Sequence, residues 1–273
     1  ALAALVDETS RMRWLRVILA GLAVGMRVVE GADVGAIFSL YVAIFVLFQA
    51  WIGGGSRVKR LGTGLGRVSL VAICAAFMAA PAVFSLVNTQ IKGVVGTGQD
   101  AQTKEQHWDW ATQWSLPVRE TTGLVVPGLF GYRMDTPDGG CYWGQVGLDP
   151  AVERYMKNGG QDSPPHGFIR YSGGGFYAGV LVVVLAFWAV TECLRRRASI
   201  YHPAQRRWLW FWLVVAVVSL LLSFGRFAPF YQLVYALPYF STIRNPVKFI
   251  TLVSFALIVI FAYGVDGLWR KYM

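Results

Sequence analysis

Apolar residues are concentrated in six blocks along the chain, and polar or charged segments separate these blocks. The blocks lie at about Trp14–Val28, Gly35–Ile52, Val68–Val87, Gly173–Thr191, Trp208–Phe224 and Phe249–Leu268. Each block is close to the roughly 20 apolar residues that a helix needs to cross a bilayer. The pattern therefore predicts an all-α polytopic membrane protein, with about six transmembrane helices.

Composition supports a membrane protein. The 273-residue chain is 55% hydrophobic and only 15% charged, whereas soluble domains carry about 25% charged residues. These values exclude a soluble globular enzyme, a disordered protein and a fibrous repeat. The net charge of +10 does not call for nucleic acid as a partner, because the basic residues lie at the ends of apolar blocks. We expect membrane lipids as partners and no nucleic acid.

Lys and Arg residues alternate between rich and poor gaps. More than half of the 25 lie before the first block, between the second and third, between the fourth and fifth, and after the sixth. The positive-inside rule places such gaps in the cytoplasm. We therefore expect both ends of this chain to be cytoplasmic. The loops at about 29–34, 88–172 and 225–248 then face outward.

The long polar segment divides the chain into three expected domains. Residues 1–87 form a first membrane unit, residues 88–172 a folded extracytoplasmic cap, and residues 173–273 a second membrane unit. Long loops are usually functional, and this one is rich in aromatic residues and glycine. We expect segment 121–131 to dip into the membrane interface. Aromatic spacing in 227–240 predicts an amphipathic helix on the outer membrane surface.

The ends and the cysteines add two expectations. The chain begins without Met and stops just after an apolar block, so we interpret it as an excerpt of a longer membrane protein. The remainder of that protein would be its partner. Cys74, Cys141 and Cys193 are expected at different depths, which indicates neither a disulfide framework nor a metal site.

Three basic residues in the last outer loop are candidates for phosphate binding. Arg226, Arg244 and Lys248 lie beside the membrane, where a lipid-linked phosphate would also lie. Arg binds phosphate through a planar fork of donors. Pro246 would begin the sixth helix, whose amino terminus also favours anions. The alternatives are anchoring to anionic lipid headgroups and pairing with acids of the loops.

Three acidic residues are candidates for catalysis. Glu30 and Asp33 lie in a short outer turn, where a carboxylate pair can act as a base or hold a divalent cation as cofactor. Asp33 can equally be a helix N-cap. Asp109 in the cap is a third candidate base, although the cap shows no metal-ligand spacing. Its acids can equally belong to turns.

Trp110, Trp114 and Trp143 in the cap can stack on the faces of sugars. They can equally form the core of the cap or an interfacial belt. In the first block, Gly21 and Gly25 have the spacing that permits close helix packing, a structural role.

Four short motifs resemble a known family. Trp114–Pro117 (WSLP) and Pro127–Gly131 (PGLFG) lie in the long outer loop, and Leu237–Phe240 (LPYF) and Arg244–Pro246 (RNP) precede the last apolar helix. Together they resemble the YfhO-like bacterial membrane proteins, which are similar to the GT-C superfamily of polytopic glycosyltransferases. The resemblance covers essentially the whole chain, as a middle portion of the family's longer chain.

The resemblance implies glycosyl transfer from a polyprenyl-phosphate-linked sugar to a cell-envelope acceptor, on the outer face of the bacterial cytoplasmic membrane. The catalytic acid of GT-C enzymes usually follows the first membrane helix, so it would lie outside this chain. No catalytic residue is carried over. Two alternatives stay open. A transporter or lipid flippase would need ionisable residues deep in its helices, and a non-catalytic scaffold would use the cap to bind proteins.

Overall fold

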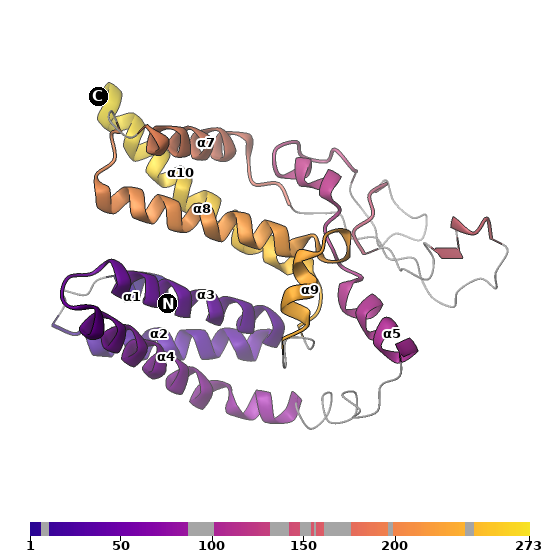
Figure 1. The fold of residues 1–273 in the computed structure, drawn as a ribbon, viewed down its shortest axis with the longest axis horizontal. Helices are drawn as coiled ribbons and strands as arrows, with labels where there is room; N and C mark the ends of the chain where they lie inside the picture. The colour runs from indigo at the N-terminus through magenta and orange to yellow at the C-terminus, as the bar shows by residue number, and fades with distance from the viewer. Residues whose placement is uncertain are drawn as a thin grey trace. The chain divides into compact units, whose positions relative to one another are not determined.

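The computed structural model describes residues 1–6, 11–86, 101–131, 142–147, 154–155, 157–160, 176–195, 199–237 and 243–273. The regular structure in these ranges is helical, and none of their residues forms a β-strand. The expected all-α class is therefore confirmed for this part of the chain. The chain divides into two compact units, Ala1–Gln99 and Asp100–Met273, which Figure 1 shows in indigo to purple and in magenta to yellow.

Four helical segments in the described ranges are long and apolar enough to cross a membrane. They are α3 (Ala32–Ile52), α4 (Arg57–Leu86), α8 (Pro203–Ser223), and α10 (Ile250–Tyr272) with the turn η5 (Pro246–Phe249) that precedes it. They correspond to the second, third, fifth and sixth apolar blocks. Their length and composition support a multi-pass membrane protein.

The other two blocks form helices of a different kind. Helix α2 (Arg13–Glu30) has Arg at three positions and a Glu at its end within 18 residues. Helix α7 (Val180–Leu194) is apolar but has only 15 residues, which is about 22 Å of helix. The number of six spans therefore stays a prediction.

In the first unit, α2 and α3 pack against α4 and against each other. A Cβ atom at Gly21 would lie 2.6 Å from Cβ of Cys74, and one at Gly25 would lie 2.6 Å from Cβ of Met78. Only residues without a side chain allow the two helices to approach so closely. The close packing that the Gly-x-x-x-Gly spacing predicts is confirmed.

Two long side chains hold the short helix α1 (Leu2–Val6) against this unit. Nη2 of Arg67 donates to the Leu5 carbonyl at 2.7 Å, and Nε2 of Gln49 donates to the Val6 carbonyl at 2.9 Å. Carbonyls at the end of a helix have no partner within it. Arg67 lies in the basic gap between the second and third apolar blocks, and here it is buried and serves as a structural donor.

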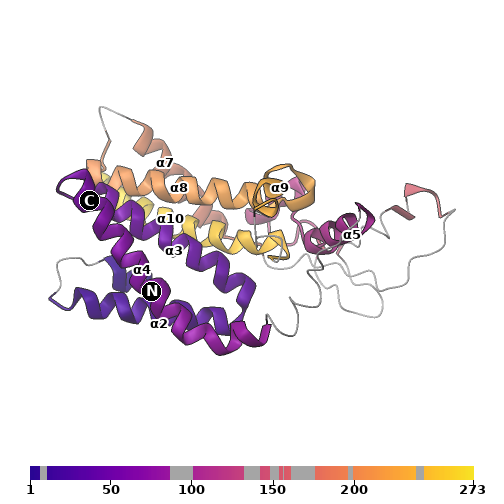
Figure 2. The same cartoon turned by 60° about the horizontal axis from the view of Figure 1, so that its bottom comes forward.

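In the second unit, α10 packs against both α7 and α8, and α8 and α10 lie side by side in Figures 1 and 2. Helices α7 and α10 run in the same direction. A Cβ atom at Gly264 would lie 2.6 Å from the Leu185 carbonyl oxygen, and further along Lys271 binds Glu192. We call this end of the second unit the Glu192 end. The opposite end, where α8 stops and η5 begins, is called the Arg244 end.

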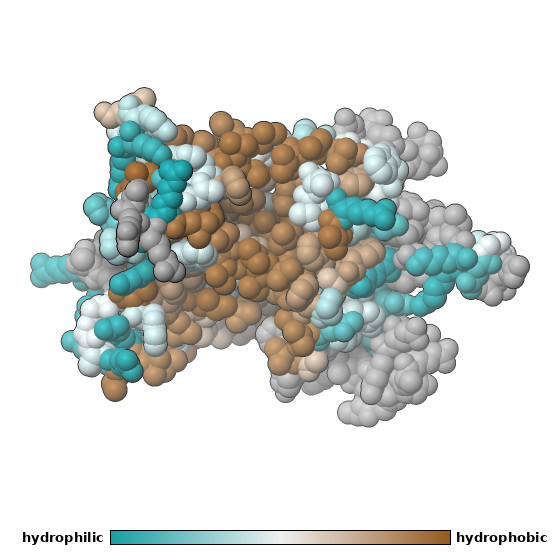
Figure 3. Space-filling view, turned by 45° about the horizontal axis from the view of Figure 1, so that its top comes forward, coloured by the Kyte–Doolittle hydropathy of each residue, from teal (hydrophilic) through white to brown (hydrophobic). Residues whose placement is uncertain are grey.

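The described part of the long loop packs onto the Arg244 end. Leu116, Leu124, Tyr142 and Val146 form one buried cluster with Phe224, Ile250 and Val253. The described residues of the expected cap and the C-terminal helices thus share one apolar core, and both belong to the compact unit Asp100–Met273. Figure 3 shows hydrophobic residues over much of the visible surface.

Candidate functional site

The candidate site lies at the Arg244 end, where the segment after α5 (Ala101–Thr112) is held by two loops. The N–H of Asn245 donates to the Ala111 carbonyl at 2.8 Å, and the N–H of Val247 donates to the Trp114 carbonyl at 2.9 Å. These two bonds tie the loop that carries Arg244 to the cap. The beginning of the last helix is therefore fixed relative to α5.

The loop after α8 holds the same segment from another direction. The N–H of Leu116 donates to the Ser223 carbonyl at 2.9 Å, and the N–H of Arg226 donates to Oγ of Ser115 at 3.2 Å. Ser115 in turn donates to the Thr112 carbonyl. Gly225 has φ +49, and a Cβ there would collide with the Ser115 side chain. Glycine is required at this crossing both for its backbone angle and for space.

Arg244 and Trp110 stack on each other. The guanidinium carbon lies 4.2 Å from the centroid of the Trp110 ring. Arg244 is half-buried, whereas Trp110 is exposed. An Arg on an aromatic face keeps its N–H groups in the guanidinium plane, where they are available to an anion.

The other two predicted cations lie on the same loops. The Arg226 side chain covers the ring of Phe227, with 5.1 Å between the guanidinium carbon and the ring centroid. Lys248 lies in η5, and its N–H donates to the Asn245 carbonyl. All three are half-buried. The backbone bonds thus bring the loops of Arg226, Arg244 and Lys248 onto one segment of the cap.

The three Trp candidates are in different surroundings. Trp110 stacks on Arg244. Trp114 packs against the buried cluster of the cap, in agreement with the alternative that the tryptophans form the core of the cap. The ring of Trp143 lies 4.8 Å from that of Phe130 and is 67% exposed. Trp110 and Trp143 therefore keep an exposed ring surface, whereas Trp114 contributes to the core.

An aromatic support beneath the site was not assigned from the sequence. Trp108 packs edge-on against Tyr235 at 4.9 Å between centroids, and Tyr231 is fully buried beside it. Both tyrosines belong to α9 (Phe230–Tyr235), which lies in the region of the predicted amphipathic helix; residues 238–240 are outside the described ranges. The Tyr231 hydroxyl donates to the Ile243 carbonyl at 2.6 Å, directly before Arg244. The aromatic spacing in 227–240 was the signal in the sequence from which this support could have been found.

Each of the three acidic candidates has a different setting. Asp109 forms an ion pair with Arg154 at 2.9 Å. Glu30 pairs with Arg27 at 2.8 Å. Asp33 is not the N-cap of α3, because that position is Gly31 and Asp33 lies in the first helical turn. An acid in that turn still favours the helix dipole.

Glu30 and Asp33 belong to the first unit, whereas Asp109 belongs to the second. Within the described ranges, no group of three or more His, Cys, Asp or Glu side chains is arranged to hold a metal ion. These settings assign no catalytic role.

A buried acid in the cap has a clearer structural role. Glu120 accepts a hydrogen bond from the Tyr142 hydroxyl at 2.5 Å and another from the N–H of Gln145 at 2.7 Å. The Tyr142 hydroxyl also accepts from the N–H of Val146. Burial, together with the bond to Glu120, raises the pKa of the Tyr142 hydroxyl above its ordinary value. This network joins Glu120 to residues 142–147 of the cap.

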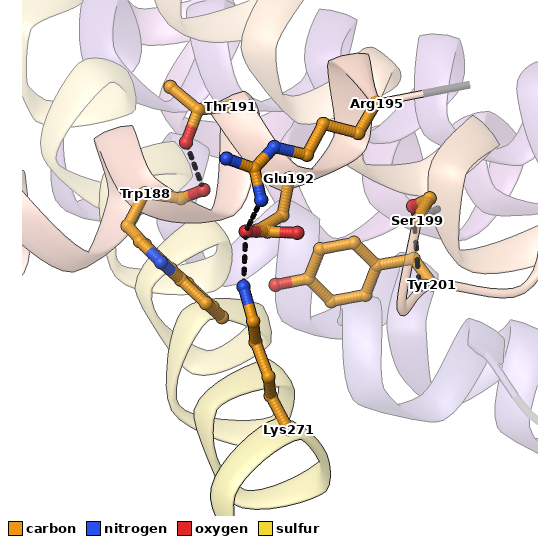
Figure 4. A network of polar contacts seen from close by, with 7 residues as sticks. All are labelled: Trp188, Thr191, Glu192, Arg195, Ser199, Tyr201 and Lys271. Atoms are coloured by element: carbon orange, nitrogen blue, oxygen red, sulfur yellow. Dashed lines mark hydrogen bonds and ion pairs between the residues drawn. The ribbon is translucent and has the colours of Figure 1, made fainter. Parts of the chain in front are cut away.

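A second polar cluster lies at the Glu192 end (Figure 4). Glu192 is buried, and its Oε1 accepts from Arg195 and from Lys271, both at 2.8 Å. The Tyr201 hydroxyl donates to the Tyr263 carbonyl at 2.8 Å. Glu192 of α7 thus binds Arg195, which directly follows α7, and Lys271 of α10. We call this arrangement the Glu192 clamp, because the bond to Lys271 joins the two helices.

No family model, curated protein or solved structure matches the chain. The YfhO-like resemblance is therefore not tested by these comparisons and stays a prediction.

Proposed function

We propose that the chain is part of a GT-C-like membrane glycosyltransferase, and that its Arg244 end binds the phosphate of a polyprenyl-linked sugar donor. The sugar would pass to a cell-envelope acceptor on the outer face of the membrane. Glycosyl transfer rests on the sequence resemblance. Phosphate binding rests on one structural observation, which is that Arg226, Arg244 and Lys248 lie on loops bound to the same cap segment.

The chemistry of Arg244 suits a phosphate. Its guanidinium is stacked on Trp110, and a stacked guanidinium can still form two parallel N–H···O bonds to one phosphate. The neighbouring residue, Asn245, is fixed through its N–H to the Ala111 carbonyl. The backbone at Arg244 is therefore held in position before any ligand binds, which reduces the entropy lost on binding.

The distribution of charge in the second unit supports the proposed orientation. Arg195, Arg270 and Lys271 lie at the Glu192 end, where Arg270 also donates to Gln205 of α8. Positive charge at that end is the pattern of a cytoplasmic side. The Arg244 end would then face outward, at the level where a lipid-linked phosphate lies.

The test is binding of a short-chain polyprenyl-phosphate sugar to the full chain in detergent. We expect Arg244→Ala to weaken binding about 10-fold or more, because a hydrogen bond to a charged group contributes about 1.5–3 kcal/mol. We expect Arg226→Ala and Lys248→Ala to weaken it as well. Arg207→Ala is the matched control, since Arg207 is an exposed Arg at the start of α8.

Two competitors distinguish the sources of phosphate. Inorganic phosphate tests the bare anion, and phosphatidylglycerol tests an ordinary anionic lipid. Preferential binding of the polyprenyl-linked sugar supports a donor site. Equal binding of phosphatidylglycerol would reduce the site to a headgroup anchor and favour the scaffold. If Arg244→Ala binds as tightly as wild type, the assignment of this site is wrong.

A further inference from the structure

Helix α7 is shorter than α8 and α10, and its alignment with α10 shows at which end α7 falls short. Lys271 and Glu192, which are in contact, are 79 residues apart, and Gly264 and Leu185 have the same spacing. Because α7 and α10 run in the same direction with this offset, Val180 at the start of α7 lies level with Val259. The first two turns of α10, from Ile250 onward, therefore extend beyond α7 towards the Arg244 end.

The cap occupies the place beside these two turns. Leu116, Leu124 and Val146 are buried against Ile250 and Val253. The N–H of Ala178, in the extended segment that leads into α7, donates to the Leu124 carbonyl at 3.0 Å. The cap therefore continues the packing surface of α7 along the same flank of α10.

Four large apolar side chains are exposed on the outer surface of this part of the cap, alongside exposed polar residues such as Arg119 and Thr122. Trp143 is 67% exposed, Val118 54%, Val126 45% and Leu129 41%. The adjoining surface of α7 is apolar as well, with Leu181 65% exposed. An apolar surface of this kind, with a Trp on it, marks an interaction site, and Trp is enriched where a protein meets the boundary of a bilayer.

The backbone of this segment is suited to an apolar environment. The N–H groups of Glu120, Val125, Val126 and Gly131 donate to carbonyls within the segment, and that of Trp143 donates to the Phe130 carbonyl. Backbone that is not α-helical is tolerated at membrane depth only where its polar groups are satisfied within the protein. The backbone N–H groups of these five residues, in the 3-10 turn η2 (Val118–Leu124), in the turns after it and at Trp143, are therefore satisfied within the protein.

We propose that the edge of the cap formed by Val118, Val126, Leu129 and Trp143 inserts into the lipid bilayer and takes up the membrane depth that α7 leaves open beside α10. Its partner is the acyl-chain and glycerol region of the leaflet at the Arg244 end. The Ala178–Leu124 bond joins the cap to the segment that leads into α7, whose Leu181 is exposed, so the lipid that would surround α7 is the occupant we assign to this edge. This inference does not depend on glycosyl transfer or on phosphate binding.

Depth-dependent quenching tests the proposal. Single-cysteine forms of the full chain, with the native cysteines replaced by serine, would carry an environment-sensitive nitrobenzoxadiazole label at Val126→Cys or Leu129→Cys. The matched controls are Arg119→Cys and Thr122→Cys, because both positions are exposed and polar on the same segment. All forms would be placed in nanodiscs whose lipids carry a nitroxide on the acyl chain.

We expect labels at 126 and 129 to emit at shorter wavelength and to be quenched more strongly by the acyl-chain nitroxide than labels at 119 and 122. Iodide in the water should quench the four labels in the opposite order. All four positions are on the surface, and circular dichroism confirms that each labelled form is folded. Equal quenching at the four positions, or stronger iodide quenching at 126 and 129, would overturn the proposal.

Discussion

The guanidinium of Arg244 lies over the indole ring of Trp110, with 4.2 Å between the guanidinium carbon and the ring centroid. The sequence assigned these residues to separate tasks, phosphate binding for the Arg and sugar stacking for the Trp. The structure joins them, because the Asn245–Ala111 bond holds their segments together. One face of Trp110 therefore supports the Arg.

This stack predicts a graded effect of substitutions at Trp110. Trp110→Ala should weaken binding of the polyprenyl-phosphate sugar about 2- to 5-fold, because an exposed cation–π contact contributes about 0.5–1 kcal/mol. Trp110→Phe should retain part of that affinity. Trp210→Ala on α8, which also removes an exposed Trp, should have no effect. Equal affinities for all four proteins would show that Trp110 does not support the Arg.

Asn245 predicts a backbone effect that does not depend on its side-chain chemistry. It has φ 63, and it is the only residue other than glycine with a positive φ in the described ranges. Asn245→Gly should unfold at nearly the wild-type temperature, whereas Asn245→Val should lower stability by about 1–3 kcal/mol. Thermal unfolding in detergent measures both. A stable Val variant would contradict the left-handed backbone at this position.

Tyr142 predicts a dependence of stability on alkaline pH. Removing its hydroxyl in Tyr142→Phe leaves the buried Glu120 without one donor, which should cost about 1–3 kcal/mol. The folded-state pKa is raised, so this stabilisation is fully present below the unfolded-state pKa of about 10. It should be lost as the pH rises above that value, when the unfolded chain ionises first.

The measurement is the difference in unfolding free energy between wild type and Tyr142→Phe, from neutral pH to pH values beyond about 10. A difference that stays constant through the alkaline range would show that the hydroxyl is not held neutral by the fold.

The Glu192 clamp predicts a loss of stability that an exposed ion pair does not share. Glu192→Gln removes the charge that both Arg195 and Lys271 contact, and it should cost about 1–3 kcal/mol. Asp266→Asn is the control, because its pair with Arg270 is partly exposed and such pairs contribute about 0–1 kcal/mol. Unfolding temperatures in detergent compare the two, and similar losses would contradict the clamp.

Alanine substitutions at two glycines of the first unit should change its stability in opposite directions. Gly21→Ala should destabilise the unit, because the new Cβ would meet the Cys74 side chain and the Val71 backbone. Gly66→Ala in α4 has open space around it and should stabilise the helix by about 0.5–1 kcal/mol. The unfolding temperatures of the two variants check this, and a gain at Gly21 would contradict the close approach of α2 and α4.

Much of the secondary structure could be predicted from local pattern. The apolar blocks located α3, α4, α8 and α10 because a span needs a run of apolar residues that a sequence displays directly. The spacing of Gly21 and Gly25 likewise predicted a close helix contact, which α4 provides. The charges of α2 are visible in the sequence, and so is the limited length of the apolar run in α7. These features distinguish the two helices from the four long apolar helices only when the helix bounds are known.

The candidate phosphate site could be predicted from the sequence only in part. Arg226, Arg244 and Lys248 could be named because their residue type and their place beside apolar blocks suit a phosphate. The attachment of their loops to the same cap segment could not be predicted, because Arg226 and Ser115 are 111 residues apart and no local pattern encodes such a contact.

The sequence by itself determined the class of protein, since the burial of apolar runs in a bilayer follows from composition and length. Only the tertiary structure decided how individual side chains are used. It placed Trp114 in the core and Trp143 at the surface, and it bound Arg67 to a helix end. The physical reason is that hydrophobicity acts residue by residue along the chain, whereas a hydrogen bond or a ring stack depends on which distant segments the fold brings into contact.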